Sequence, residues 1–232
     1  MATEATTSRG GRQRTAGHRV PLSRERILEA AMRIADRGGI DAVTMRRLGQ
    51  ELRVEAMSLY NHVANKDDIL TAIVDAVESE IELPDPGDPW KVALRKTAIS
   101  YHDALGRHPW AASLALRLIG TRPARYRYMN GVLGTLRRAG FSDVLTELGY
   151  HTLESHVAGF TLWVEQLQVD EDGTDPAELA SRFIAEISTG EYPFLVEHAE
   201  QHMKPTAADT PSTFAFGLDL ILDGLERALA AG

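Results

Sequence analysis

The chain has 232 residues, of which 44% are hydrophobic, 6% aromatic and 25% charged. That length and apolar content can bury a sizeable core in one large domain or two small ones. The chain has no cysteine, which excludes disulfides, thiol catalysis and thiolate metal sites. No apolar run is long enough to span a membrane or to resemble a secretory leader, so we expect a cytoplasmic protein.

The net charge of −8 is unevenly distributed along the chain. Residues 1–66 contain 12 Lys and Arg against 7 Asp and Glu, which leaves 13 of the 25 basic and 26 of the 33 acidic residues to 67–232. A basic end joined to an acidic remainder is expected of a protein that touches phosphates at one end only. Ordinary solvation of two surfaces would produce the same split, so charge alone leaves nucleic-acid binding open.

Residues 1–21 are rich in Thr, Ser, Gly and Arg and have almost nothing to bury, so we expect a disordered basic arm. Its arginines could follow the DNA backbone or enter a minor groove, as basic arms do. They are Arg9, Arg12, Arg14 and Arg19. The alternative is a tail that only keeps the protein in solution.

Residues 22–66 have the pattern of three short helices. Ser23 is an N-cap candidate, and the helix that follows carries an apolar stripe and ends at Gly38–Gly39. The stripe consists of Ile27, Leu28, Ala31, Ile34 and Ala35.

Thr44 is the N-cap candidate of the second helix, whose apolar face repeats at spacings of three and four. After a turn at residues 53–55, a third helix is expected over residues 56–63. The side chains expected to close the three-helix core are Met45, Leu48, Leu52, Val54, Leu59 and Val63. Two helices joined by so tight a turn form a helix-turn-helix, whose last helix can enter a DNA major groove.

A fourth helix is expected over residues 67–84, where acidic residues in the first turn suit the helix dipole. The proline-rich stretch Pro84–Pro89 then ends it, and this is the clearest boundary in the chain. The fourth helix would therefore connect the DNA-binding end to everything that follows.

The rest of the chain, residues 85–232, also has helical periodicity, and no alternating stretch suggests a strand, so the fold class is all-α. Helices are expected over 90–107, 108–118, 122–138, 143–168, 176–187 and 212–229, with an acidic loop at 170–175 and an irregular or partly helical segment at 189–211. The helices near 143–168 and 212–229 are apolar on more than one face. Such a helix lies either in the middle of a monomer or against a second subunit.

Three motifs follow one another between Thr44 and Leu70: T-x-R-R-L, V-x-x-x-S-L-Y-x-H-V and N-K-D-x-I-L. With them the chain resembles the tetracycline-repressor (TetR) family of transcriptional regulators. Landmarks similar to the C-terminal domain of the tetracycline repressor are Ile119–Pro123, Ala139–Ser142, Gly159–Leu162 and Phe216–Ile221. The resemblance covers roughly residues 20–230.

The resemblance implies a ligand-responsive regulator, more often a repressor than an activator. Such a protein binds a palindromic operator as a homodimer and is released by a small-molecule inducer. The helices near 143–168 and 212–229 of each protomer would form the dimer interface. Domain bounds on this interpretation are 1–21 for the arm, 22–66 for the DNA-binding domain, 67–84 for the connecting helix and 85–232 for the ligand-binding and dimerisation domain.

The predicted DNA contacts combine this resemblance with side-chain chemistry. They are Thr44, Arg46, Arg53, Ala56, Met57, Ser58, Tyr60, Asn61, His62 and Lys66. The two apolar residues suit thymine methyl groups, and the serine and asparagine can hydrogen-bond base edges. The remaining residues would hold the phosphate backbone, Arg46 reaching a guanine or a phosphate. The alternatives are a packed ring for Tyr60 and a capping or stacking role for His62.

Two departures from the family concern the DNA contacts. Arg53 stands at the turn where the family usually has glycine, which costs about 1 kcal/mol if φ is positive. Ala56 and Met57 replace a polar residue and a proline of the tetracycline-responsive protein, so we expect a different operator.

An inducer would sit among the helices of residues 90–168 and push on the fourth helix. Candidate lining residues are Thr97, Tyr101, Arg122, Pro123, Met129, Val132, Phe160 and Trp163. Core packing is the alternative for the aromatic residues, and a surface salt bridge is the alternative for Arg122. Leu118 and Glu82 occupy positions where the tetracycline-responsive relatives have histidines, so we expect no magnesium, no cofactor and a different, apolar or aromatic inducer.

Two other functions are alternatives to a ligand-sensing regulator. An enzyme is not expected, since the chain has no glycine-rich phosphate loop and no nucleophile elbow, and His151 and His156 lie about 140° apart on a helix. His198 and His202 have metal-ligand spacing without an evident third ligand. A DNA-binding dimer with no small-molecule input would show solid packing, whereas a cavity of roughly 300–1,000 Å³ would favour the sensor.

Overall fold

The computed structural model describes residues 21–115, 117–118, 121–167, 176–186, 191–202 and 212–231. These segments contain helices and no strand, which confirms the all-α prediction. The elements are α1 (Arg24–Gly38), η1 (Ile40–Ala42), α2 (Met45–Leu52), α3 (Ala56–Leu59), α4 (Lys66–Ser79), α5 (Trp90–Arg107), α6 (Trp110–Ala115), α7 (Pro123–Arg138), α8 (Asp143–Leu167), α9 (Pro176–Glu186), α10 (Pro193–His202) and α11 (Thr213–Ala231). The predicted arm over residues 1–21 and the acidic loop over 170–175 lie, apart from Pro21, outside the described residues.

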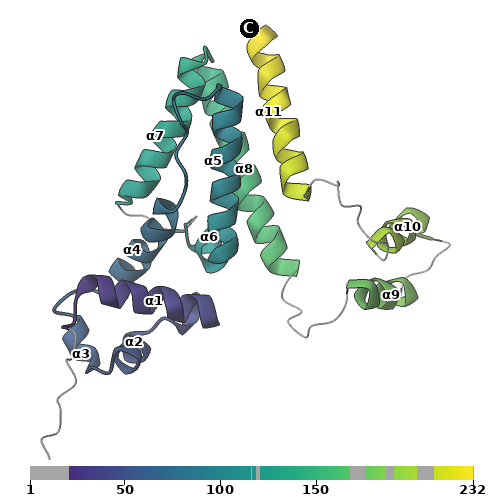
Figure 1. The fold of residues 1–232 in the computed structure, drawn as a ribbon. Coiled ribbons are helices and arrows are strands. Elements are labelled where there is room, and N and C mark those ends of the chain that lie inside the picture. The colour runs from purple at the N-terminus through teal and green to yellow at the C-terminus, as the bar shows by residue number, and fades with distance from the viewer. Residues whose placement is uncertain are drawn as a thin grey trace, which may run out of the picture.

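The helices α1, α2 and α3 form one group at the purple end of the chain in Figure 1. Both predicted N-caps are present: the Ser23 hydroxyl accepts from the Arg26 amide at 3.4 Å, and the Thr44 hydroxyl accepts from the Arg47 amide at 3.2 Å. The predicted core is also present, with Ile27, Ile34, Leu48, Leu59 and Val63 all buried. Four apolar side chains from three helices, with Val63 from the turn after α3, thus fix the arrangement of the motif.

The third helix is shorter than the expected 56–63, because α3 ends at Leu59. The amides of Tyr60, Asn61 and His62 donate to carbonyls three residues back, so the chain continues as a tight turn. Asparagine and histidine are weak helix formers. Asn65 must also be extended in order to cap α4, where its side chain accepts from the Asp68 amide at 2.8 Å.

The connecting helix also ends earlier than the expected residue 84. It covers Lys66–Ser79, and the amides of Glu80 and Ile81 donate to carbonyls three residues back, which closes the helix with a tighter turn. The buried face of α4 starts at Ile69 in the DNA-binding end and reaches Glu78 in the body. This helix therefore connects the two ends of one continuous core.

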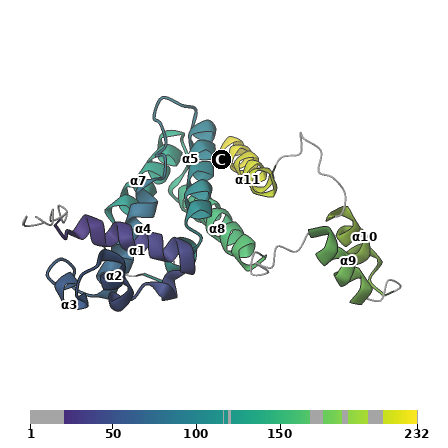
Figure 2. The same cartoon turned by 60° about the horizontal axis from the view of Figure 1, so that its bottom comes forward.

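The body consists of α5 to α8 together with α11. Helix α5 lies between α7 and α11 and packs on α8 (Figure 2). The expected bounds of α5, α7, α8 and α11 agree with the structure to within two residues at each end, whereas α6 is shorter than 108–118. Helices α8 and α11 lie side by side, and each buries one face and exposes another.

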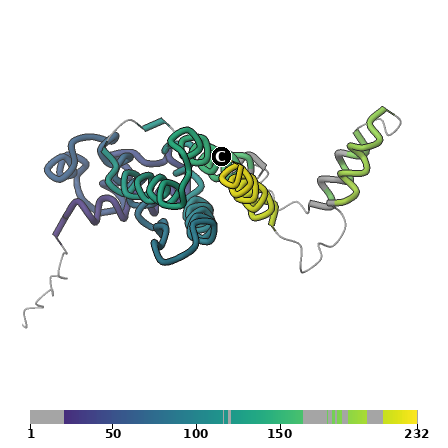
Figure 3. Tube along the Cα trace, turned by 90° about the horizontal axis from the view of Figure 1, so that it is seen from above, coloured from purple at the N-terminus to yellow at the C-terminus, as the bar shows by residue number. Residues whose placement is uncertain are grey.

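Helices α9 and α10 pack against each other, and all three views set this pair apart from the other helices (Figure 3). The segment 189–211, expected to be irregular or partly helical, contains the ten-residue helix α10.

Candidate DNA interface and effector site

The helix-turn-helix depends on two backbone features at the turn. A Cβ at Gly49 would lie 2.9 Å from the Val54 carbonyl oxygen and 3.2 Å from the Ala56 nitrogen, so only glycine allows α2 to approach the start of α3 this closely. Arg53 ends α2 in the left-handed region, with φ 56° and ψ 45°. It is the only non-glycine residue of the described chain with positive φ.

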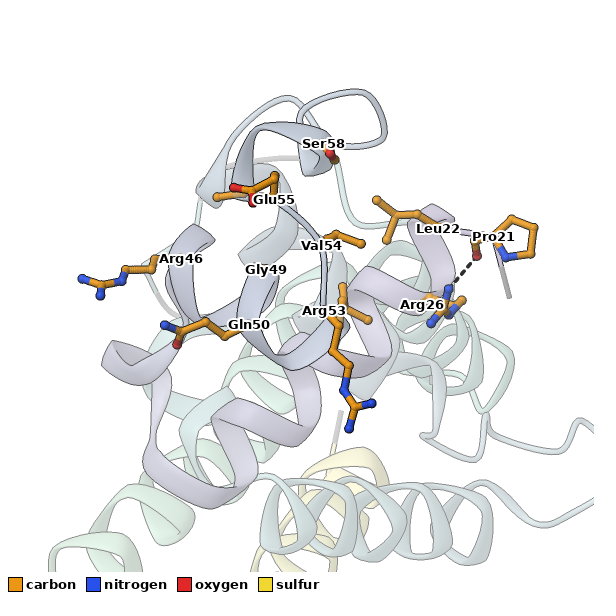
Figure 4. A pocket seen from close by; sticks show the side chains of 12 residues that line it. Pro21, Leu22, Arg26, Arg46, Gly49, Gln50, Arg53, Val54, Glu55 and Ser58 are labelled. Carbon is orange, nitrogen blue, oxygen red and sulfur yellow. Dashed lines mark hydrogen bonds between the residues drawn. The ribbon is translucent and has the colours of Figure 1, made fainter. Parts of the chain in front are cut away.

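A hollow of about 1,010 Å³ lies between the start of α1, α2 and α3 (Figure 4). Four of the predicted DNA contacts line it: Arg46, Arg53, Ala56 and Ser58. In Figure 4 Arg53 points away from Glu55 and Ser58, and Arg46 extends to the opposite side of Gly49. Two guanidinium groups at different places on one open surface suit two positions along a phosphate backbone.

The other predicted contacts surround this surface. Met57 is 75% exposed and Tyr60 is 46% exposed, so neither the Met57 thioether nor the Tyr60 ring packs in the core. Asn61 and His62 are exposed on the turn after α3, and Lys66 is half-buried at the start of α4. Thr44 already uses its hydroxyl as the cap of α2.

Three further residues of the DNA-binding end were absent from the prediction, and two of them, Gln50 and Arg26, line the hollow. Gln50 is exposed beside Arg46 on the polar face of α2, which helical spacing could have indicated. Arg26 donates to the Pro21 carbonyl at 2.7 Å and so holds the chain that leads toward the arm. Arg24 donates to both Asp68 carboxylate oxygens, at 2.8 and 2.6 Å, and lowers the pKa of Asp68 to about 2. This last pair joins the start of α1 to the start of α4.

In the body, one ion pair joins α4 to the start of α7. Arg122 donates to Glu78 Oε1 at 2.8 Å and to the Ala115 carbonyl at 3.2 Å. The Glu78 side chain is 2% exposed and that of Arg122 is 11% exposed, so the pair is buried and is not the surface salt bridge considered from the sequence. Burial raises the pKa of Glu78 to about 7, although Arg122 acts in the opposite direction.

A second ion pair lies next to the first. Arg125 on α7 is paired with Glu154 on α8, and it also donates to the Tyr150 hydroxyl at 3.0 Å. The Tyr128 hydroxyl donates to the other Glu154 oxygen. Burial and the Glu154 carboxylate raise the pKa of Tyr150 to about 12, so its hydroxyl stays protonated at neutral pH.

A cavity of about 40 Å³ separates the two ion pairs. It is lined by Glu78, Tyr101, Leu105, Ala112, Ala115, Arg122, Arg125, Glu154 and Ala158. Two of the eight predicted ligand residues, Tyr101 and Arg122, are therefore brought together here. The cavity is well below the 300–1,000 Å³ of a formed ligand site.

The other six predicted ligand residues do not line this cavity. Thr97 and Val132 are buried, Phe160 is half-buried, and Trp163 is 54% exposed. Pro123 is exposed at the start of α7. Met129 lines a different hollow, of about 300 Å³, between α7 and α8. Spacing along one helix could not indicate which of its faces the cavity uses.

A polar cluster joins the DNA-binding end to the body. Asp36 at the end of α1 accepts from His108 Nδ1 and from Trp110 Nε1, both at 2.7 Å. Glu80 accepts from Arg107 at 2.6 Å, and its other oxygen lies 3.4 Å from His108 Nε2. The cluster of Asp36, Glu80, Arg107, His108 and Trp110, hereafter the α1–α6 latch, thus connects α1, α4, α5 and α6.

In the part of the chain that the structure describes, no three His, Asp or Glu side chains come together as metal ligands do. Nor does any helix of these segments combine the length and apolarity required to cross a bilayer.

Comparison with known proteins decides between the functions that this geometry allows. Residues 27–73 match the model of bacterial regulatory proteins of the tetR family, and residues 83–229 match that of the tetracyclin repressor-like C-terminal domain. The chain belongs to the TetR family. It is accordingly a DNA-binding transcriptional regulator and not an enzyme.

Relatives of this TetR protein match over nearly its whole length. The HTH-type transcriptional repressor DrrR1 of Streptomyces coeruleorubidus is 30% identical over 95% of this chain and 83% of its own. The class D tetracycline repressor protein of Escherichia coli is 33% identical over 90% of this chain and 92% of its own. The structure of Streptomyces coelicolor ActR in complex with actinorhodin superposes with a TM-score of 0.71 and 29% identity, covering 90% of this chain and 99% of that one.

Proposed function

We propose that this TetR protein represses transcription as a homodimer that binds a palindromic DNA operator and is released by a small-molecule inducer. The DNA-binding domain would comprise residues 22–66, with residues 1–21 as a basic arm. Residues 67–84 would connect it to a ligand-binding and dimerisation domain over 85–232. The observation that carries the proposal is the open, arginine-containing surface of α2 and α3 next to the exposed Met57 and Tyr60.

The homodimer is supported by an exposed apolar surface on α8 and α11. Its large side chains are 54–67% exposed, and on each helix they recur at helical spacing. We call this surface the outer stripe; it consists of Val144, Leu148, Ser155, Gly159, Trp163, Phe216 and Leu220. A second copy of the chain would bury the outer stripe. The two helix-turn-helix motifs of such a two-fold dimer can read two half-sites about 34–36 Å apart.

The inducer is supported by the body of the molecule and by its relatives. Polar side chains buried among apolar helices are typical of a binding site, and here they surround a cavity that touches α4. ActR, whose fold this chain shares, was solved with actinorhodin bound. The small cavity volume favours a second function, a DNA-binding dimer without small-molecule input, and the two are separated by screening compounds for release of a bound operator.

The DNA-binding proposal is tested by selecting duplexes from a random library with the purified protein. We expect enrichment of an inverted repeat. The affinity for it should fall steeply as the salt concentration rises, because the DNA-binding domain of each protomer neutralises several phosphates. Enrichment of no two-fold sequence, or an affinity insensitive to salt, would contradict the proposal.

A further inference from the structure

Glu78 is a buried carboxylate with an unused oxygen. Oε1 accepts from Arg122, but Oε2 is buried and has no hydrogen-bond partner. Glu78 is the only charged residue among the fully buried ones in the described segments. Leaving a buried acceptor unpaired is costly, so its environment is complete only when a donor reaches it. Glu78 lines the 40 Å³ cavity, which can hold one small polar group.

The charged groups around this cavity balance one another. Two carboxylates, Glu78 and Glu154, face two guanidinium groups, Arg122 and Arg125, in two pairs. A ligand with a net charge would enter a buried site without a counter-charge, or would have to break one pair and leave an uncompensated ion. The site therefore discriminates against both anions and cations.

Apart from Tyr101, the rest of the lining is apolar and small. Leu105, Ala112, Ala115 and Ala158 form the wall beside the ion pairs. Three alanines have no long side chain to fill the space, and two of them lie on the short helix α6. Movement of that helix would widen the cavity at the cost of the hydrogen bond from Arg122 to the Ala115 carbonyl, while both carboxylate–guanidinium pairs lie outside α6.

We propose that Glu78 is the residue of α4 that holds the effector, and that the effector is an uncharged, largely apolar molecule whose hydroxyl group donates a hydrogen bond to Glu78 Oε2. This inference rests on the proposed function and specifies its ligand. Because α4 also packs in the DNA-binding end through Ile69 and Ile73, an effector anchored at Glu78 contacts directly the helix that both parts share.

The probe is 2-naphthol, titrated against the full-length protein by ligand-observed NMR at pH 8, above the pKa of about 7 of Glu78, where its carboxylate is ionised. Matched compounds are 2-methoxynaphthalene, which lacks the donor, 2-naphthoate, an anion, and 2-naphthylmethylamine, a cation at this pH. We expect saturable binding of 2-naphthol, with each of the other three weaker by about tenfold or more, the range of a hydrogen bond to a charged acceptor. Equal binding of the methoxy compound, tighter binding of either ion, or no binding of 2-naphthol would overturn the proposal.

Two variants locate the binding at Glu78. E78Q keeps the shape but replaces the charged acceptor and should weaken 2-naphthol binding about tenfold, and E78M should abolish it. D103N, an exposed acid on α5, should leave the affinity unchanged. Unaltered affinity in E78Q removes Glu78 from the site even if E78M fails to fold. The operator assay on the unaltered protein separates the two proposals: if it binds the operator but not 2-naphthol, only the effector class is refuted.

Discussion

Arg53 has a backbone conformation that glycine adopts at much lower cost, at φ 56° in the turn of the DNA-binding motif. Replacing it by glycine should raise stability by about 1 kcal/mol, equivalent to about 2–4 °C in Tm for a chain of this size. The same change removes a guanidinium from the surface that we propose faces DNA and should lower non-specific DNA affinity. Thermal unfolding and a DNA titration at low salt measure the two effects.

The matched control for this substitution is Arg53→Ala. Alanine removes the guanidinium but keeps a Cβ in the left-handed region, so DNA affinity should fall as in R53G while Tm does not rise. Equal DNA binding by R53G and the unaltered protein would show that Arg53 does not contact phosphate.

Glu78 should make the protein less stable as pH rises. Its pKa is about 7 in the folded chain and near 4.5 when exposed, so the folded state holds the proton more tightly. The stability that this proton provides is complete below pH 4.5 and is lost as pH rises through 7, in total about 3 kcal/mol. Urea unfolding at pH 5 and pH 8 measures this loss of stability. The difference between the two pH values should disappear in E78Q and persist in D103N. Asp68, with its pKa lowered to about 2, affects stability only below about pH 4.

The sequence alone could predict that Glu78 is buried, but not that it pairs with Arg122. Position 78 continues the apolar stripe of α4 at four residues from Val74, so helical spacing puts it inside. Its partner Arg122 lies 44 residues away in sequence, and no local pattern could pair them. For the same reason no local pattern could pair Arg125 with Glu154, which lies 29 residues away.

At the scale of elements, the sequence indicated which helices exist better than where they end. Ser23, Thr44 and Asn65 all cap helices as side-chain chemistry requires, and the expected α5 has the observed bounds. The largest errors lie at the ends of α3 and α4, where hydrogen bonds to carbonyls three residues back replace the regular helical bonds. That choice depends on tertiary neighbours and on the next element's cap, which periodicity does not contain.

The α1–α6 latch should stabilise the contact between the DNA-binding end and the body. Asp36→Ala leaves the buried indole N–H of Trp110 without its acceptor, which should lower stability by about 1–3 kcal/mol. Asp36→Asn retains one acceptor and should cost less. Operator affinity should also fall in the alanine variant, because α1 is then held less firmly against α6.

The control is Asp41→Ala in η1, an exposed acid of the same DNA-binding end, which should change neither quantity. Urea unfolding followed by tryptophan fluorescence measures stability, and the operator titration measures coupling. If Asp36→Ala is as stable as the unaltered protein, the indole finds another acceptor and the latch does not hold the two parts together.

At the scale of the whole molecule, the sequence left two explanations for the apolar helices near 143–168 and 212–229. The structure separates their faces: Leu153, Val157, Leu218 and Leu222 are buried within the chain, whereas the outer stripe is exposed. Periodicity could not make this separation, because it depends on α5 and α7 packing on α8, and on α11 packing on α5 and α8. One subunit thus accounts for the inner faces only, and the proposed homodimer would cover the outer stripe with a second copy.

Leu220→Glu should therefore convert the dimer to a monomer of 25.5 kDa. Leu220 is 55% exposed, so the charge should be tolerated within one chain, but a two-fold interface brings the substitution in twice and buries both carboxylates. Sedimentation velocity measures the mass, and operator affinity should fall strongly because each monomer reads only one half-site. Leu83→Glu, an equal change at a 45% exposed leucine outside the outer stripe, should leave the dimer intact. If the Leu220→Glu protein still sediments as a dimer, the interface lies elsewhere. An interface through Leu220 would have to bury two unpaired carboxylates and should dissociate.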